Sequence, residues 1–237
     1  MLEIKNFSKS YKNTVKAVDN LTLTVEPGDI YAFIGHNGAG KTTTLKAIAG
    51  ILDFEDGDIH IDGYSIRKDP MECKRRIAYT PDNPELYEHL TGIQYLTFIA
   101  DVFGLGAERE ERIRQYSDAF EMTPHLGDLI SSYSHGMKQK IAMISGWIHD
   151  PKLFLLDEPF VGLDPKASAI VKEYMREKCR NGSAVFFSTH ILEVAEKLCN
   201  KVAIISRGRL VVSGRMEDVL ADQSLEKVFL EVSEHAE

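Results

Sequence analysis

The stretch that decides the fold is IYAFIGHNGAGKTTTLKAIAG, residues 30–50. Residues 30–34 form a short apolar run typical of a buried strand, and the residues from Lys41 onward are typical of a helix. Between them, Gly35–Thr43 matches the pattern G-x-x-x-x-G-K-[ST], which requires a strand before it and a helix after it. A chance glycine turn is the alternative, and this strand and helix context weakens it. The sequence therefore predicts a phosphate-binding loop.

The residue types in this loop suit the binding of a nucleotide. Gly38 and Gly40 let backbone N–H groups wrap the phosphates without a Cβ in the way. Lys41 can reach the β and γ phosphates, and the Thr42 hydroxyl can ligate Mg²⁺. The predicted nucleotide contacts cover the loop and the start of the helix: Gly35, His36, Asn37, Gly38, Ala39, Gly40, Lys41, Thr42 and Thr43.

Short apolar strands alternate with helices around this loop. The expected strands are 2–7, 21–28, 30–34, 58–62, 152–157, 183–190, 201–206 and 209–214, and the expected helices outside the middle of the chain are 41–50, 165–178 and 191–199. This alternation predicts an α/β fold with a mainly parallel sheet covered on both faces. The middle of the chain, about 86–150, interrupts the pattern and is expected to form a helical lobe.

Composition narrows the class of protein. The chain has 237 residues, of which 43% are hydrophobic and 27% charged, as expected of a soluble globular protein. It has no apolar stretch approaching roughly 20 residues and no signal-peptide pattern at its start, so a cytoplasmic protein is expected. The scattered cysteines, Cys73, Cys179 and Cys199, are expected to be ordinary thiols. A net charge of −8 argues against non-specific nucleic-acid binding and leaves only a local basic patch open.

A second motif, KLFLLDEPFVGLD at residues 152–164, delivers two carboxylates at the end of an apolar strand. Asp157 is suited to hold the Mg²⁺ shell, and Glu158 can polarise a water for in-line attack on the γ-phosphate. If the motif stood alone, two solvated carboxylates in a loop would be the better interpretation. Beside a phosphate loop, the catalytic one is favoured.

A further anion-binding feature lies about a hundred residues after the first, in ISSYSHGMKQK at residues 130–140. Ser134 and Gly136 stand at the start of a segment whose apolar residues recur at helical spacing. A helix N-terminus presents unpaired N–H groups and the positive end of a dipole. The chain is therefore expected to contact phosphate at two separate places.

The segments GHNGAGKTT, YSHGMKQK, LLDEP, GLD and STH, in this order, resemble the ATP-binding-cassette (ABC) ATPase family along nearly the whole chain. The resemblance implies one ABC domain over 1–237, with an N-terminal antiparallel β subdomain beside the parallel core and the helical lobe. YSHGM corresponds to the family signature usually written LSGGQ, which binds the ATP held by the opposite subunit. Two chains, head to tail, would then sandwich two ATP molecules, which explains two phosphate contacts in one chain.

The resemblance also assigns single residues. Tyr11 matches the aromatic residue that stacks on adenine, with an ordinary surface tyrosine as the alternative. His190, in FFSTH, matches the switch histidine that contacts the γ-phosphate, although a histidine after a strand is by itself more often an ordinary surface or core residue. Asp164, in VGLD, matches the loop that couples the two sites. It also suits the N-cap of the helix that begins at Pro165, and both interpretations can hold.

Two positions depart from the family pattern. In YTPDNPELYEHLT, Asp82 replaces the usual Gln of the loop that senses Mg²⁺ and the membrane partner. An acid can still ligate Mg²⁺ but cannot donate a hydrogen bond as an amide does. In the signature, His135 and Met137 stand for Gly and Gln. ATP binding is expected to survive, because its contacts come from Ser134, the Gly136 backbone and the helix N-terminus.

The resemblance implies a transporter subunit that works on the inner face of the cell membrane with a separately encoded transmembrane subunit. The chain lacks a second cassette and a long coiled-coil insertion, which other ABC settings require. SHGMKQK and the ending SLEKVFLEVSE are similar to cassettes of bacterial multi-subunit exporters, with importers left open. The docking surface is expected around 82–90 and on the helix that follows, where exposed apolar residues such as Leu86 and Tyr87 either receive a helix of the partner or pack locally. A nucleotide-dependent, dimerising regulatory module with little turnover is the alternative, favoured only by Asp82.

Overall fold

The computed structural model describes residues 1–11 and 15–235, and these fall into two compact units. The first unit comprises Met1–Tyr79, Lys152–Pro159 and Met175–Glu237. The second comprises Thr80–Pro151 and Phe160–Tyr174.

The first unit is built on a six-stranded sheet with the order β10-β9-β3-β8-β7-β6. Its strands are β3 (Ile30–Ile34), β6 (Ile77–Thr80), β7 (Leu153–Asp157), β8 (Ala184–Thr189), β9 (Lys201–Ser206) and β10 (Arg209–Arg215). β3 runs parallel to β8 and β9, β7 runs parallel to β8, and only β10 pairs antiparallel with its neighbour β9 among the pairings described. Every residue of β3, β7 and β8 is buried, which explains their nearly unbroken apolar sequences. The predicted mainly parallel α/β core is confirmed.

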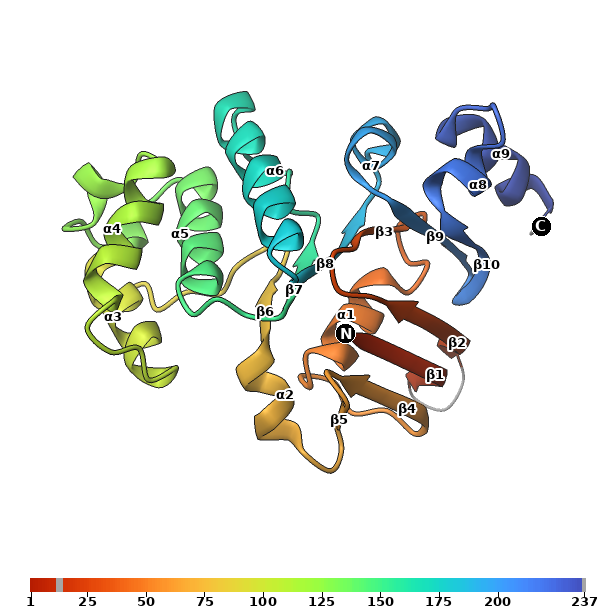
Figure 1. The fold of residues 1–237 in the computed structure, drawn as a ribbon, viewed down its shortest axis with the longest axis horizontal. Coiled ribbons are helices and arrows are strands. Elements are labelled where there is room, and N and C mark those ends of the chain that lie inside the picture. Colours follow the sequence, from red (N-terminus) through yellow and green to blue (C-terminus); the bar gives the residue numbers. More distant parts are fainter. Residues whose placement is uncertain (12–14, 236–237) are drawn as a thin grey trace. The chain divides into compact units, whose positions relative to one another are not determined.

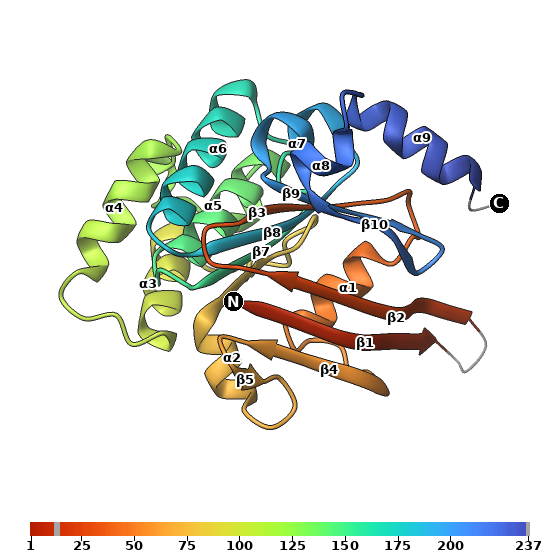
Figure 2. The ribbon, with the colours of Figure 1, turned by 45° about the vertical axis from the view of Figure 1, so that its right-hand side comes forward.

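A smaller antiparallel sheet completes the strands of the first unit, with the order β2-β1-β4-β5 (Figure 2). Its strands are β1 (Leu2–Tyr11), β2 (Val15–Val25), β4 (Asp56–Ile61) and β5 (Tyr64–Ser65). In β1, Leu2 and Ile4 are buried while Glu3 and Lys5 are exposed, as expected for a strand with one face toward a core. This is the antiparallel β subdomain that the family resemblance implies.

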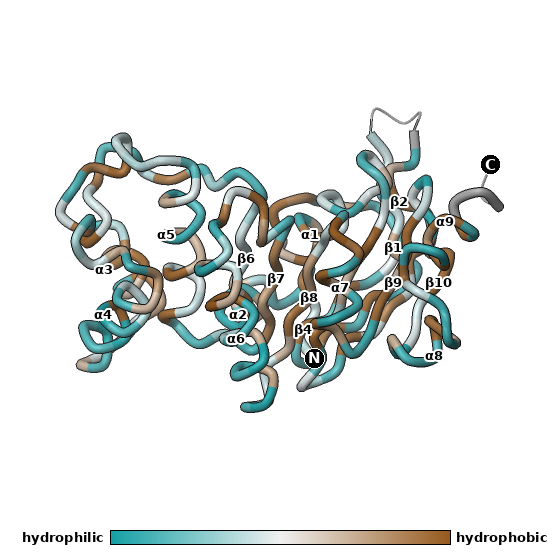
Figure 3. The backbone as a smooth tube through the Cα atoms, turned by 90° about the horizontal axis from the view of Figure 1, so that it is seen from above, coloured by the Kyte–Doolittle hydropathy of each residue, from teal (hydrophilic) through white to brown (hydrophobic). Residues whose placement is uncertain are grey.

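One hydrophobic core joins the two sheets of the first unit. Leu2 of β1, Leu155 of β7 and Phe186 of β8 belong to the same buried cluster as Leu45 and Ile48 of α1 (Lys41–Ile48). In Figure 3, the backbone is coloured as hydrophobic along β7 and β8. Because α1 begins directly after the glycine-rich loop, burial of its apolar side chains holds that loop at the edge of the core.

Helices complete both units (Figure 1). The first unit also contains α2 (Pro70–Arg76), α7 (Leu192–Leu198), α8 (Met216–Leu220) and α9 (Leu225–His235). The second contains α3 (Gly92–Val102), α4 (Arg109–Ala119), α5 (His135–Trp147) and the short 3₁₀ helices Thr123–His125 and Ile130–Ser132. α6 (Pro165–Arg180) begins in the second unit and ends in the first.

The second unit has its own aromatic core and a well-defined helix start. The ring of Tyr174 in α6 lies 5.0 Å from Trp147 of α5 and 5.3 Å from Tyr116 of α4, measured between centroids. These ring contacts tie α4, α5 and the first part of α6 together.

At the N-terminus of α3, Thr91 and Gln94 form a reciprocal capping box.

The remaining expectations from composition concern the cysteines and membrane spans. Cys73, Cys179 and Cys199 are all buried and free, and burial raises the pKa of each thiol. Over the described ranges 1–11 and 15–235, no helix combines the length and the apolar character that crossing a bilayer requires.

Candidate functional site

The glycine-rich loop is shaped by close backbone contacts. Gly40 has φ +108°, and a Cβ there would lie 2.5 Å from the carbonyl oxygen of Ala17. A Cβ on Gly35 would lie 2.5 Å from the carbonyl oxygen of Ile205. Gly38, at φ +79°, has open space around it. Glycine is thus required at 35 and 40 by packing within the protein, in addition to any approach of phosphate.

Lys41, the first residue of α1, lies inside this loop. Its side chain is buried, and Nζ donates hydrogen bonds to the carbonyl oxygens of Gly35, at 2.7 Å, and of His36, at 3.3 Å. Nζ also lies 3.9 Å from Glu158 Oε1. Burial lowers the pKa of Lys41, while Glu158 and Asp157 oppose that shift. The ammonium is therefore held at the mouth of the loop, where a phosphate can compete for its N–H groups.

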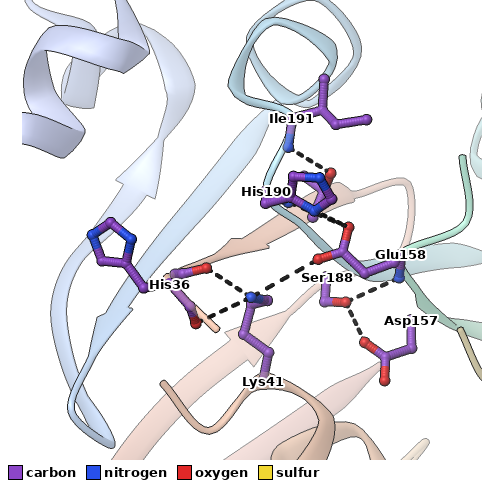
Figure 4. Close-up of polar contacts among 9 residues, drawn as sticks. His36, Lys41, Asp157, Glu158, Ser188, His190 and Ile191 are labelled. Carbon is purple, nitrogen blue, oxygen red and sulfur yellow. Dashed lines mark hydrogen bonds and ion pairs between the residues drawn. The ribbon is translucent and has the colours of Figure 1, made fainter. Parts of the chain in front are cut away.

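Asp157 and Glu158 stand at the carboxyl end of β7, next to the end of β8 (Figure 4). Asp157 is buried, and its Oδ1 accepts a hydrogen bond from the Ser188 hydroxyl. Glu158 Oε2 lies 2.9 Å from Nδ1 of His190 and accepts a hydrogen bond from the His190 backbone N–H at 3.3 Å. The parallel pairing of β7 and β8 brings these groups together across about thirty residues of sequence.

The structure thus brings four predicted site residues together in the first unit: Lys41, Asp157, Glu158 and His190. Thr42 is exposed at the start of α1. Tyr11 is exposed, and its hydroxyl lies 3.4 Å from Thr43 Oγ1.

Ser188 is a member of this cluster that the sequence interpretation missed. The available signal was a polar residue directly after the apolar run AVFF of β8, at a position that pairs with Asp157. The significance of Ser188 can be recognised only when the strand order is known.

The signature residues lie in the second unit. Ser134 is the N-cap of α5, and its hydroxyl accepts a hydrogen bond from Met137 N–H at 3.3 Å. A Cβ on Gly136 would lie 2.8 Å from the carbonyl oxygen of Gly162. The first turn of α5 is therefore packed closely against the loop that leads to Asp164, and only glycine fits at 136.

Asp164 caps the following helix. Its carboxylate accepts a hydrogen bond from Ala167 N–H at 2.8 Å and lies 3.0 Å from Lys140 Nζ. The bond from Ala167 and, next, the contact with Lys140 lower the pKa of Asp164. The capping interpretation of this residue is confirmed, and its coupling role stays a prediction.

The loop after β6 carries the remaining predicted residues. Asp82 is exposed, Leu86 is half-buried, and Tyr87 is 51% exposed while its ring contacts Phe98 at 5.7 Å between centroids. Leu86 thus packs partly into the unit, whereas Tyr87 keeps half of its surface free.

The oxygen donors near Lys41 fit a hard cation. The Asp157 carboxylate and the Thr42 hydroxyl are the kinds of ligand that Mg²⁺ prefers, and Asp157 is already oriented by Ser188. Among the residues that the structure describes, no group of three or more His, Cys, Asp or Glu side chains forms a metal cage. Mg²⁺ is usually bound through one or two side chains, the nucleotide phosphates and water.

Comparison with known proteins gives the family. Residues 18–161 match the family model described as "ABC transporter". The ABC-type transporter ATP-binding protein EcsA of Bacillus subtilis is 34% identical, over 98% of this chain and 96% of that protein. The linearmycin resistance ATP-binding protein LnrL of Bacillus subtilis is 31% identical, over 92% of this chain and 70% of that protein.

The fold agrees with these relatives. A solved structure described as the ATP-binding subunit of an ABC transporter superposes with a TM-score of 0.94 at 35% identity, covering 98% of this chain and 99% of that one. The structure places a buried lysine at the start of α1, two carboxylates at the end of β7 and a serine cap at the start of α5. The chain belongs to the ABC transporter family, as an ATP-binding subunit that hydrolyses ATP to power transport.

Proposed function

We propose that Lys41, Asp157, Glu158 and His190, which the first unit brings together, form the hydrolytic half of the ATP site. Glu158 is the general base. The observation that carries this is the position of its carboxylate, which is 3.9 Å from Lys41 Nζ on one side and 2.9 Å from His190 Nδ1 on the other. A carboxylate between a phosphate-binding lysine and a histidine can accept the proton of a water that attacks the γ-phosphate in line. His190 orients Glu158 and contacts the γ-phosphate, and Tyr11 stacks on adenine.

The phosphates of ATP bind to the loop from Gly35 to Thr43. The N-terminus of α1 offers backbone N–H groups that Gly40, its N-cap, has no side chain to satisfy. Lys41 exchanges its carbonyl contacts for the β and γ phosphates. Charge-assisted contacts with phosphate are stronger than contacts with neutral carbonyls, so this exchange is favourable.

Mg²⁺ is the proposed metal, held by Thr42 and Asp157. When bound, it neutralises charge between the β and γ phosphates. Asp82 is proposed as a further ligand on the family resemblance alone, because it replaces the Gln of the loop that senses Mg²⁺.

The working assembly is a head-to-tail dimer of two cassettes. Ser134, Gly136 and Asp164 of one chain would complete the ATP site of the other. Support comes from Ser134, an exposed hydroxyl-bearing cap at the start of α5, which suits an anion approaching from outside the unit. The two units together act as one ABC domain over 1–237 in which the helical lobe carries the signature.

The membrane partner is a separately encoded transmembrane subunit on the inner face of the cell membrane. The second unit exposes the large apolar side chains Tyr87, Ile93, Phe98, Val102 and Leu129. Phe98 and Val102 lie one turn apart on α3, and the Phe98 ring contacts the ring of Tyr87 at 5.7 Å between centroids. Exposed apolar residues that lie side by side in this way are typical of a protein interface.

The direction of transport is proposed to be export. The support is the likeness of SHGMKQK and the C-terminal segment to exporter cassettes, together with a relative whose name states resistance to linearmycin. Removal of a toxic compound is one way in which a transporter confers resistance.

Steady-state phosphate release tests the proposed function. The purified chain is given Mg²⁺ and ATP, alone and with its co-purified transmembrane subunit, and Lys41→Ala serves as the inactive control. Turnover that depends on Lys41 and rises with the partner supports an energy-coupling ATPase. Nucleotide-dependent dimerisation without turnover, even with the partner present, would instead favour the regulatory module.

A further inference from the structure

The hydroxyl of Ser188 touches both acidic residues of the ATP site (Figure 4). Ser188 is 0% exposed, in the strand β8 next to β7. Its hydroxyl donates a hydrogen bond to Asp157 Oδ1 and accepts one from the backbone N–H of Glu158 at 3.1 Å. One buried oxygen atom therefore links the carboxylate assigned to the metal with the backbone of the assigned general base.

The hydrogen bond to Asp157 fixes which oxygen of that carboxylate remains available to a metal ion. A serine hydroxyl has a single proton to donate, and here it goes to Oδ1. Oδ2 does not receive this proton and would be available to a cation. A residue that donates a hydrogen bond to a metal-binding carboxylate fixes the orientation of that carboxylate. Such residues typically contribute 10- to 100-fold to metal affinity.

The contact with Glu158 supports an unusual backbone conformation. Glu158 has φ +49°, in the left-handed region that residues other than glycine rarely adopt. Its N–H is shared between the hydroxyl of Ser188 and the carbonyl oxygen of Ser188, at 3.1 and 3.2 Å. This turn directs the Glu158 carboxylate toward Lys41 and His190 instead of continuing the line of β7.

We propose that Ser188 is a positioning residue for hydrolysis, which orients Asp157 toward the metal and holds the turn at Glu158 with the same hydroxyl. The inference rests on the proposed roles of Asp157 and Glu158. A merely structural serine would need only neutral partners for its polar atoms, such as the Ala142 carbonyl and the Tyr95 hydroxyl for Ser145. Ser188 is instead hydrogen-bonded to the carboxylate of Asp157 and to the backbone N–H that begins the turn at Glu158.

The test compares Ser188→Ala with Ser188→Thr, which keeps the hydroxyl, and with Ser145→Ala as the matched control. Ser145 is also a buried serine, but its hydroxyl donates to the carbonyl oxygen of Ala142 at 2.7 Å inside α5. Four quantities are measured on each purified chain: the thermal unfolding midpoint, the affinity for a fluorescent ATP analogue in EDTA, the affinity for Mn²⁺ in the presence of ADP by electron paramagnetic resonance, and the Mg²⁺ dependence of ATP turnover.

Ser188→Ala is expected to bind the ATP analogue in EDTA within about twofold of the parent, because the phosphate loop is untouched. Its Mn²⁺ affinity should fall about tenfold, its kcat should fall by a similar factor, and its half-saturating Mg²⁺ concentration should rise. Ser188→Thr should recover most of both losses. Ser145→Ala should lower only the unfolding midpoint.

Unchanged Mn²⁺ affinity and kcat in Ser188→Ala would overturn the inference, as would an equal loss in Ser188→Thr. A loss of metal-free ATP binding in step with the other quantities would overturn it too, because it would mean a general structural defect. These failures differ from failure of the proposed function, in which the parent itself would show no hydrolysis dependent on Mg²⁺.

Discussion

At the scale of single residues, the negative charge of Glu158 can be removed without changing the size of its side chain. Glu158→Gln removes the proton acceptor and the negative charge that lies 2.9 Å from His190, while Lys41 and the loop remain intact. The variant should therefore bind ATP normally and hydrolyse it about a hundredfold or more slowly, a typical loss for a general base.

Phosphate release and the affinity for a fluorescent ATP analogue measure the two effects separately. Glu193→Gln is the control, because Glu193 is an exposed carboxylate that pairs with Lys197 at 2.7 Å and lies outside the cluster. Turnover of Glu158→Gln within a few-fold of the parent would remove Glu158 from the role of base.

Two glycines of the phosphate loop differ in what an added methyl group would meet. At Gly40 it would approach the Ala17 carbonyl oxygen to 2.5 Å, in a backbone that L-residues disfavour, whereas at Gly38 it meets nothing within 4 Å. Gly38→Ala should therefore cost about 1 to 2 kcal/mol from the left-handed backbone alone. Gly40→Ala should lower the free energy of unfolding by clearly more.

Urea unfolding followed by circular dichroism gives both values. Gly182→Ala, also at positive φ with open space around it, reports the backbone effect outside the loop. Equal losses in all three variants would mean that the contact with Ala17 relaxes and does not restrict position 40.

At the scale of elements, α3 has one face that its own unit does not cover. Val102, near its C-terminal end, is 62% exposed, and Phe98, one turn earlier, is exposed as well. Val102→Asp should leave the thermal unfolding midpoint nearly unchanged, because an exposed substitution removes little buried area. It should greatly reduce co-purification with the transmembrane subunit, because a carboxylate in an apolar interface loses hydration.

Pull-down of the membrane subunit from solubilised membranes measures this association. Gln115→Asp in α4, an exposed position away from the apolar face, adds the same charge as a control. Full association of Val102→Asp would place the docking surface elsewhere on the chain.

At the scale of the whole molecule, the proposed sandwich requires two chains for each ATP. Lys41→Ala and Ser134→Arg should each spoil both sites in their own homodimers, by loss of the ammonium or by a bulky side chain at the start of α5. In a heterodimer of the two, one site combines both defects and the other is intact. Mixing should therefore restore part of the ATP-dependent association that neither variant shows alone.

Light scattering measures that association, with Glu158→Gln added to both chains to block turnover. Tagged chains confirm that heterodimers form. If both motifs served one ATP within a single chain, every subunit would carry a defect, and mixing would rescue nothing.

The features that the sequence by itself determined are local ones. The apolar run 30–34, the glycine-rich loop and the following helix are adjacent in the chain, so residue order alone predicts the strand, the loop and the helix. The same holds for Asp164 as the cap of α6, since a cap bonds to N–H groups only three residues away. The alternation of strands and helices along the chain also predicted a mainly parallel sheet. That prediction needs only the type of each element and not the knowledge of which strands lie side by side.

What only the tertiary structure decided is which distant residues meet. Ser188 reaches Asp157 and Glu158 because β8 lies beside β7, and no periodicity in the sequence encodes that strand order. The need for glycine at 40 likewise comes from Ala17, on a strand of the other sheet. Such contacts arise when burial of apolar faces packs the sheets together, so the hydrogen bonds that aim the two carboxylates follow from the packed core and not from the motif that carries them.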